Sequence, residues 1–234
     1  MSFHYILLSF HVLLTFPRIH GQCAFNLHHL TASSKFPANC SQIFGRFTVD
    51  QTSGVTDAQL SEIFANVKEI QGVVQIWNTQ FTSVNFLKTI ERLTGDYLDK
   101  SLSIVNNSRL TSLDLPSLVK SNGKLEIVNN PVLNLRSQCS TFHSAFFNRR
   151  SVSGNEFDCG CDLIVPFKWS SVKNFPTGCV VLYGNLVLEG SAPPVEVLYR
   201  MSAVTKLYGN LEVKQTNLET LGFLQNLEEI ESGT

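Results

Sequence analysis

The sequence contains the same arrangement of residues twice, and this duplication constrains the fold more than any other feature. PANCSQIFGRFTVD, starting at Pro37, aligns with PTGCVVLYGNLVLE, starting at Pro176, with proline, cysteine and glycine in the same places. A second pair of segments, 72–93 and 209–230, aligns in the same order and at nearly the same offset. Two matches in one order indicate an internal duplication, so we expect two related folding units.

A shorter period runs inside each copy. Apolar–polar–apolar triplets recur about every 25 residues, which is the period of a solenoid with one short strand per coil. Each triplet predicts a strand with two inward side chains, and stacked coils bury them together. The sequence therefore predicts a mainly β, α/β solenoid, a right-handed β-helix similar to leucine-rich repeats. The triplets are 47–49, 74–76, 102–104, 125–127, 186–188 and 211–213.

Two further patterns repeat with the coils. LSIVNN at 102–107 matches LEIVNN at 125–130, so Asn107 and Asn130 follow their strands at equivalent positions. A buried amide there can satisfy backbone groups at the turn. Segments 58–70 and 195–207 have apolar residues at helical spacing and predict two amphipathic helices at equivalent places.

The N-terminus and the composition limit the class of protein. Residues 1–21 read as a signal peptide, with an apolar run at 5–16 that is too short to span a bilayer. No later stretch reaches the length of a membrane helix, so no membrane span is expected. The formal net charge is −1 and the chain has no basic stripe, which argues against a nucleic-acid partner.

The cysteines and sequons fit a secreted chain. Six cysteines follow the predicted signal peptide, and an even number favours disulfides over a metal site. The Cys159-Gly-Cys161 pair has no second pair at zinc-ligand spacing, so we expect neither metal nor cofactor. Asn39 and Asn106 begin N-glycosylation sequons. The cysteines are Cys23, Cys40, Cys139, Cys159, Cys161 and Cys179.

A family resemblance follows from these motifs taken together. A Cys-then-Gly lead-in, a short strand, a helix, a G-x-L-x-[IV] strand with a Thr or Asn marker and a closing FL-x-x-[LI]-E resemble the receptor L domain of insulin and EGF receptor ectodomains. GCVVLYGNLVLEG from Gly178 to LQNLEEI from Leu224 is the closest part. The resemblance covers roughly residues 23–234. It implies two tandem L domains, 22–158 and 159–234, that bind an extracellular peptide hormone.

The chain departs from those receptors in two ways. Only about 40 residues lie between Cys139 and Cys179, where the receptors have a long cysteine-rich module. The chain is therefore more similar to the nematode proteins that consist of L domains alone. The second copy also lacks equivalents of the coils at 102–104 and 125–127, so we expect an incomplete second domain or a partner that covers its open end.

The duplication also predicts how the cysteines pair. Cys23 with Cys40 and Cys161 with Cys179 would close the start of each copy at similar sequence separations. Cys139 then remains for Cys159 at the end of the first domain. Six cysteines can pair in many other ways, so this pairing depends on the repeat. Next to these cysteines, Arg149 and Arg150 are predicted to lie in a solvated loop, and the alternative interpretation of this pair is a dibasic cleavage site.

The outward positions of the first sheet are the candidate binding site. One outward column contains Gln75, Ser103 and Glu126, and the other contains Trp77, Val105 and Val128. Tryptophan and exposed apolar patches are typical of protein interfaces. Alternatively, this apolar column packs under a loop, under a glycan on Asn106 or against the other domain.

No enzyme class is supported by the sequence. It lacks G-x-S-x-G, H-E-x-x-H and P-loop motifs, and the outward carboxylates do not cluster on neighbouring coils as a glycosidase requires. We therefore expect a non-enzymatic protein that binds or sequesters a peptide-hormone-like or growth-factor-like ligand, or that modulates a receptor for one. The alternative is a structural or innate-recognition solenoid that binds matrix or microbial ligands.

Overall fold

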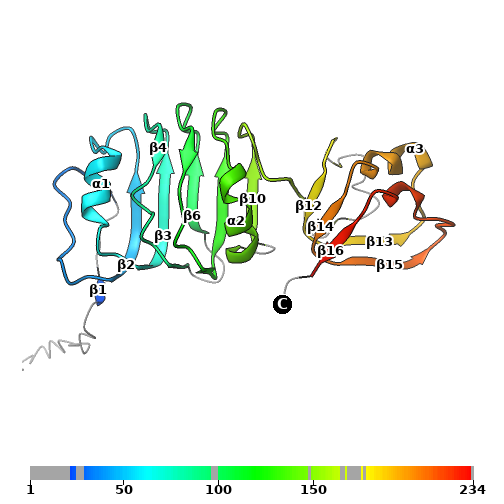
Figure 1. The fold of residues 1–234 in the computed structure, drawn as a ribbon, viewed down its shortest axis with the longest axis horizontal. Coiled ribbons are helices and arrows are strands. Elements are labelled where there is room, and N and C mark those ends of the chain that lie inside the picture. Colours follow the sequence, from blue (N-terminus) through cyan, green and yellow to red (C-terminus); the bar gives the residue numbers. More distant parts are fainter. Residues whose placement is uncertain are drawn as a thin grey trace, which may run out of the picture.

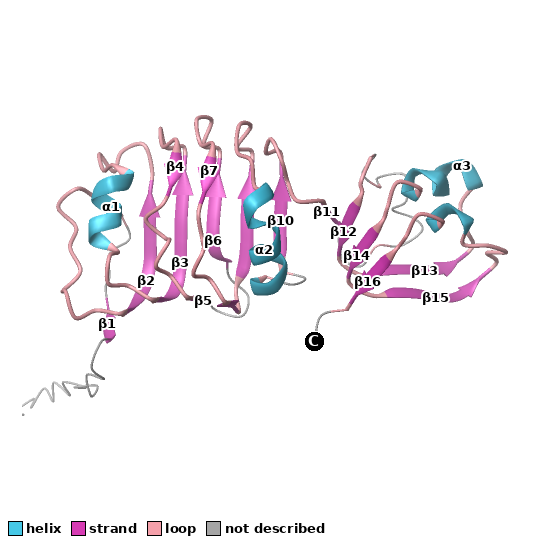
Figure 2. Ribbon diagram, viewed as in Figure 1, coloured by secondary structure: helices cyan, strands magenta, loops and turns pink. Residues whose placement is uncertain are grey.

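The computed structural model describes residues 22–24, 29–95, 100–146, 149–163, 167, 175 and 178–232, which form two units of parallel strands (Figures 1 and 2). The signal peptide predicted at 1–21 lies outside these residues. Within the described part of the chain, no helix is long and apolar enough to cross a membrane.

The first unit contains short strands with two helices among the connections. In chain order its elements are β1 (Gln22–Ala24), β2 (Gln42–Val49), α1 (Asp57–Ile63), β3 (Glu69–Trp77), β4 (Ser83–Val84), β5 (Arg92–Thr94), β6 (Lys100–Val105), β7 (Ser112–Leu113), β8 (Lys120–Ser121), β9 (Lys124–Val128), a 3₁₀ turn at Arg136–Gln138, α2 (Cys139–Ala145) and β10 (Arg150–Ser153). The second unit follows with β11 (Cys161–Asp162), β12 (Val181–Tyr183), β13 (Leu186–Gly190), α3 (Val195–Leu198), a 3₁₀ turn at Tyr199–Met201, β14 (Lys206–Tyr208), β15 (Leu211–Thr216), a 3₁₀ turn at Gly222–Leu224 and β16 (Glu229–Glu231).

The main sheet of the first unit is parallel and has the order β1-β2-β3-β6-β9-β10. Parallel neighbours require a connection that returns the chain to the start of the next strand, and the long segments between the predicted triplets supply it. The inward residues of each triplet are fully buried in one core. β5 pairs with both β3 and β8, so it adds a second row of pairing beside the first half of β3.

The second unit repeats this arrangement with shorter strands. β11, β12, β14 and β16 form one parallel sheet, and β13 pairs with β15 in another. Its separate core is lined by Leu182, Leu186, Leu188 and Leu207, among others. β12 and β13 correspond to the two halves of β2, because the duplication aligns Leu182 with Ile43 and Leu186 with Phe47.

Glycine is required at a positive-φ bend within β3 and again at the bend between β14 and β15. Gly72 has φ +138°, and a Cβ built on it would lie 2.0 Å from the carbonyl oxygen of Gly45 on the adjacent strand. Gly209 has φ +155° and the same 2.0 Å approach to the oxygen of Gly184. No other residue avoids both the backbone strain and the overlap. The two glycines aligned by the duplication are therefore required for the same structural reason.

The predicted polar markers form a buried ladder along the first core. The Asn107 side-chain oxygen accepts hydrogen bonds from the Thr79 backbone at 2.9 Å and hydroxyl at 2.8 Å. Asn130 accepts from the Asn107 backbone at 3.0 Å, and Asn155 accepts from the Asn130 backbone at 3.2 Å. Each amide thus satisfies backbone groups of the preceding turn. Asn155, which the triplet pattern did not identify, extends the ladder to β10.

The two helices are shorter than predicted. α1 ends at Ile63, and α3 gives way to a 3₁₀ turn after Leu198, whereas the sequence predicted 58–70 and 195–207. A capping box of Thr56 and Gln59 fixes where α1 starts. The backbone amides of Lys68 and Glu69 both donate to the Ser41 carbonyl, which draws this segment into sheet pairing. Apolar residues at helical spacing therefore continued past the end of the helix.

All six cysteines are paired. The disulfides are Cys23–Cys40, Cys139–Cys159 and Cys161–Cys179, with Cα–Cα distances of 5.7, 5.4 and 6.0 Å. These are the three pairs that the duplication predicts. Cys159 packs in the first core and Cys161 packs against the second, so the change from one core to the other falls at Gly160.

Arg150 joins the two units, and its predicted place in a solvated loop is wrong. It lies in β10, and its side chain is only 1% exposed. Its Nε donates to Asp162 Oδ1 at 2.7 Å, and its guanidinium lies 3.6 Å from the centre of the Tyr183 ring. An arginine stacked on a ring and paired with a carboxylate is stable when buried, which the dibasic sequence did not reveal.

Candidate functional site

The apolar column on the outer face of the first sheet is in register across three strands. Trp77 pairs with Val105, and Val105 pairs with Val128. Trp77 is 47% exposed, whereas the two valines are half-buried beside it. The indole is thus the prominent part of the column. A large exposed aromatic ring on a flat sheet face is the kind of group that anchors protein interfaces.

The second predicted column forms a polar ladder along the same face. Gln75, Ser103 and Glu126 are neighbours in register, and the Thr48 hydroxyl donates to Gln75 Oε1 at 3.2 Å. Ser103 is only 6% exposed, and its hydroxyl donates to Glu126 Oε2 at 2.5 Å. Of this column, Gln75 and Glu126 present their polar groups most directly to a partner.

Glu126 carries the negative charge of this ladder. Lys100 donates to its Oε2 at 2.6 Å. Burial alone would raise the pKa of Glu126, but the hydrogen bonds from Lys100 and Ser103 outweigh it and lower the pKa overall. The carboxylate therefore stays ionised and fixed in position. This part of the face offers paired charges at its rim and apolar surface next to them.

An asparagine in the left-handed region follows each of the three strands that carry the apolar column. Asn78, Asn106 and Asn129 have φ values of 52°, 57° and 58°. Asparagine tolerates this conformation better than most residues, which accounts for the repeated choice. Asn106, the first residue of a predicted sequon, is exposed directly after Val105. Asn39, in the other sequon, is also exposed.

A groove that the sequence did not predict lies on the same face, toward the starts of the strands. Val73 is buried but does not belong to the core, so it lies on the outer side with Gln75 and Trp77. The groove has a volume of about 630 Å³. We call it the glycine groove. Its lining residues are Phe44, Gly45, Arg46, Gln71, Gly72, Val73, Thr94, Gly95 and Asn122.

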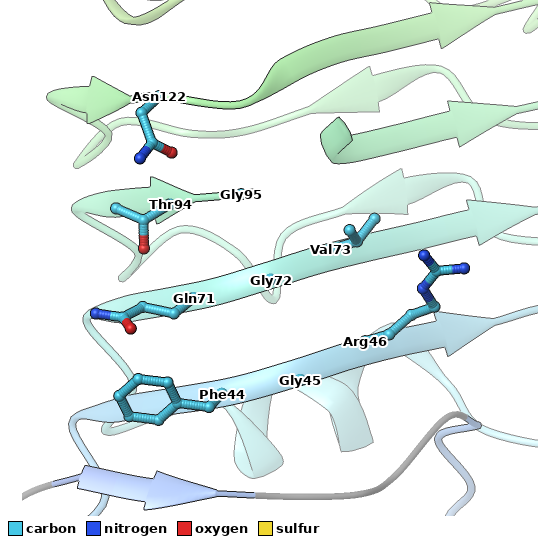
Figure 3. A pocket seen from close by; sticks show the side chains of 9 residues that line it. All are labelled: Phe44, Gly45, Arg46, Gln71, Gly72, Val73, Thr94, Gly95 and Asn122. Carbon is cyan, nitrogen blue, oxygen red and sulfur yellow. The ribbon is translucent and has the colours of Figure 1, made fainter. Parts of the chain in front are cut away.

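Figure 3 shows how these residues are arranged. Phe44, Gln71, Thr94 and Asn122 form one row across the strands, and the three glycines lie beside this row. Arg46 and Val73 border the other side of the glycines. The duplication identified Gly45 and Gly72 in the sequence, since they align with Gly184 and Gly209. However, nothing in it placed Asn122, which follows the two-residue strand β8, at the end of the row.

The corresponding positions of the second unit are charged. Glu189 and Lys214 face each other across β13 and β15, and Lys214 also pairs with Glu212 at 2.9 Å. No aromatic residue takes the place of Trp77 there, because the duplication aligns Trp77 with Lys214. The candidate binding face is therefore specific to the first unit.

One cluster near β2 resembles a catalytic arrangement in composition only. His29 Nε2 lies 3.0 Å from Asp50 Oδ1 and 3.2 Å from the hydroxyls of both Thr52 and Ser53. Hydrogen bonds from Thr52 and His29 lower the pKa of Asp50 to about 2. All three partners meet the same ring nitrogen, so His29 cannot relay a proton from a hydroxyl to the carboxylate. Among the described residues, no cluster of His, Cys, Asp or Glu could hold a metal ion.

Parallel strands, paired cysteines and an open sheet face define a disulfide-bonded domain of the extracellular type. The sequence model of the receptor L domain family matches residues 39–144 and 178–234, and the chain belongs to this family. It is a family of non-catalytic binding domains. The chain is also similar to Protein irld-34 of Caenorhabditis elegans, with 27% identity over 214 residues, which cover 81% of this chain and 53% of the relative. It thus spans about half the length of that curated relative.

Proposed function

We propose that the chain is a secreted, non-enzymatic binding protein whose first sheet binds a peptide-hormone-like or growth-factor-like ligand, or a receptor for one. In this proposal residues 1–21 are a signal peptide. Residues 22–158 form a first right-handed β-helix of stacked coils, and a second begins at 159. The observation that carries the proposal is the exposed Trp77 in register with Val105 and Val128.

The polar surroundings of Trp77 support a protein ligand. Gln75 and the ionised Glu126 lie next to the apolar column, as polar groups do at the rim of protein interfaces. Membership of the receptor L domain family supports a protein ligand as well. A glycan on Asn106 would stand beside Val105 and limit the direction from which a ligand approaches.

The test is binding of the full, disulfide-bonded chain to a panel of insulin-like and EGF-like peptides. We expect saturable binding that weakens at least about tenfold in Trp77→Ala, because truncating an interface tryptophan removes a large anchor. Tyr199→Ala is the matched control, since Tyr199 is a similarly exposed aromatic residue, at 51%, in the second unit. Equal loss in both variants, or no binding by folded protein, would contradict the proposal.

A second variant separates the glycan from the sheet. Ser108→Ala removes the Asn106 sequon but leaves the left-handed Asn106 in place. We expect this variant to bind at least as tightly as the glycosylated protein. If binding instead disappears with the glycan, the ligand recognises the sugar and not the sheet.

A further inference from the structure

We propose that the glycine groove of the first unit binds an extended, acidic segment of a protein partner. This inference deepens the proposed function and depends on the partner being a protein. It concerns a different part of the face from the Trp77 column. Val73 and Trp77 are four residues apart on β3, which is about 13 Å along a strand. The two features can therefore be tested separately.

The shape of the groove fits an extended chain. The row from Phe44 to Asn122 crosses β2, β3 and β5 and ends at the residue after β8 (Figure 3). Strands in a sheet are about 4.8 Å apart, so the row is about 14 Å long, the length of roughly four extended residues. The glycines carry no side chains that could cover the backbone between the two sides of the groove (Figure 3).

The polar groups of the groove require both donors and acceptors from a guest. Arg46 is exposed and forms no ion pair or hydrogen bond within the described part of the chain. Asn122 Oδ1 is buried and has no hydrogen-bond partner among the same residues. A polypeptide supplies backbone N–H groups for an oxygen such as this one, and an acidic side chain supplies a carboxylate for Arg46. A neutral guest would leave the arginine unpaired.

In the second unit, side chains from the first unit cover the equivalent row. Register places Ala24, Phe44, Gln71 and Thr94 in line in the first unit, and Asp162, Tyr183, Tyr208 and Glu231 in line in the second. The first unit inserts two side chains onto the second row. Arg150 contacts Asp162 and Tyr183, and His143 stacks on Tyr208 at 3.8 Å and meets Glu231 at 3.0 Å.

The two rows carry opposite charges, so they are expected to bind side chains of opposite charge. The second row carries two carboxylates and receives an arginine and a histidine. Among the described residues, those that line the first groove include Arg46 and no carboxylate. The first unit thus has the same arrangement of strands as the row that binds basic side chains in the second unit, but it carries a positive charge in place of the carboxylates. An acidic partner is the complement.

The test is an NMR titration of the full, isotope-labelled chain with a capped five-residue peptide that has one central glutamate. Its matched control is the same peptide with glutamine. We expect saturable shifts at the amides of Gly45, Gly72 and Gly95 with the glutamate peptide. We expect about tenfold weaker binding with the glutamine peptide or with Arg46→Gln. Arg109→Gln, an exposed arginine outside the groove, should bind as the wild type does.

Three outcomes would overturn the inference. The first is equal binding of the glutamate and glutamine peptides. The second is an absence of shifts at the three glycine amides. The third is saturable shifts at these amides when a neutral chitin trisaccharide replaces the peptide. Trp77→Ala separates this inference from the proposed function. If the hormone panel fails to bind while the glutamate peptide still shifts the glycines in Trp77→Ala, the proposed hormone ligand is wrong and the groove is not.

Discussion

The same row of aligned positions is open in the first unit and covered by side chains in the second unit. In the first unit Phe44 and Gln71 line an open groove beside Arg46, which has no ion pair or hydrogen bond among the described residues. In the second unit the aligned residues are Tyr183 and Tyr208, and they are covered by Arg150 and His143 of the first unit. The glycine bends at Gly72 and Gly209 are the same. The two units therefore share the backbone arrangement of this row, and the side chains on it determine which groups can pack there.

The largest expected effect comes from the bend that both rows share. Gly72→Ala should destabilise the first unit by about 4 kcal/mol, because its Cβ would overlap the Gly45 carbonyl oxygen and φ would be strained. Gly54→Ala, at φ +58° with nothing within 4 Å, should cost only about 1 kcal/mol. Urea unfolding measures both. Equal midpoints for the two variants would show that the bend does not require glycine.

The docking of the two units should be the next most sensitive feature. Arg150→Met leaves Asp162 buried without its partner, so we expect a loss of about 3 kcal/mol from the second unit. Arg149→Met, at the exposed neighbouring position, should cost well under about 1 kcal/mol. Hydrogen exchange at β11 and β12 reads the effect. Unchanged protection there in Arg150→Met would mean that the arginine does not hold the second row.

The buried asparagine ladder is a further difference between the two units, and its loss should affect the stability of the first unit only. Asn130→Ala should destabilise the first unit by about 2 kcal/mol, because it removes the acceptor for Asn107 and the donor to Ile104. Asn210→Ala in the second unit removes an exposed amide and should cost less than about 0.5 kcal/mol. Thermal unfolding compares the two. Similar losses of stability in the two variants would show that the ladder does not contribute more than an exposed amide.

The smallest effect is a pH dependence of opposite sign in the two regions. The pKa of Asp50 is lowered from 3.8 to about 2, so its contribution is present above pH 3.8 and is lost as pH falls toward 2. Burial raises the pKa of Asp162 despite Arg150, so Asp162 favours folding more at low pH. Asp50→Asn should flatten the acid loss of stability in urea unfolding at pH 2–4. An unchanged slope would contradict this assignment.

Sequence periodicity was enough to locate most of the first sheet. Its triplets gave the buried strand residues, the outward Trp77 column and the Asn107 and Asn130 markers. The duplication gave the disulfide pairs. These features depend on local alternation or on an internal repeat, and both are present in a single sequence.

Features that depend on distant contacts could not be predicted in the same way. β10 begins with Arg150, whose burial depends on Asp162 and Tyr183 in the other unit, so its strand looked like a charged loop. The groove needs Asn122 beside Thr94, and β8 is too short to show a triplet. Helical spacing of Phe64 and Val67 continued past the end of α1 because both residues are buried in the turn that follows.

The most direct test of the contrast between the rows is hydroxyl-radical footprinting of the full chain, with each rate normalised to the unfolded protein. Trp77, at 47% exposure, should be oxidised readily, and Tyr183, at 4%, should be protected. In Arg150→Met the protection of Tyr183 should fall while Trp77 is unchanged. If Tyr183 reacts as fast as Trp77 in the wild type, Arg150 does not cover the second row, and the two rows do not differ as described.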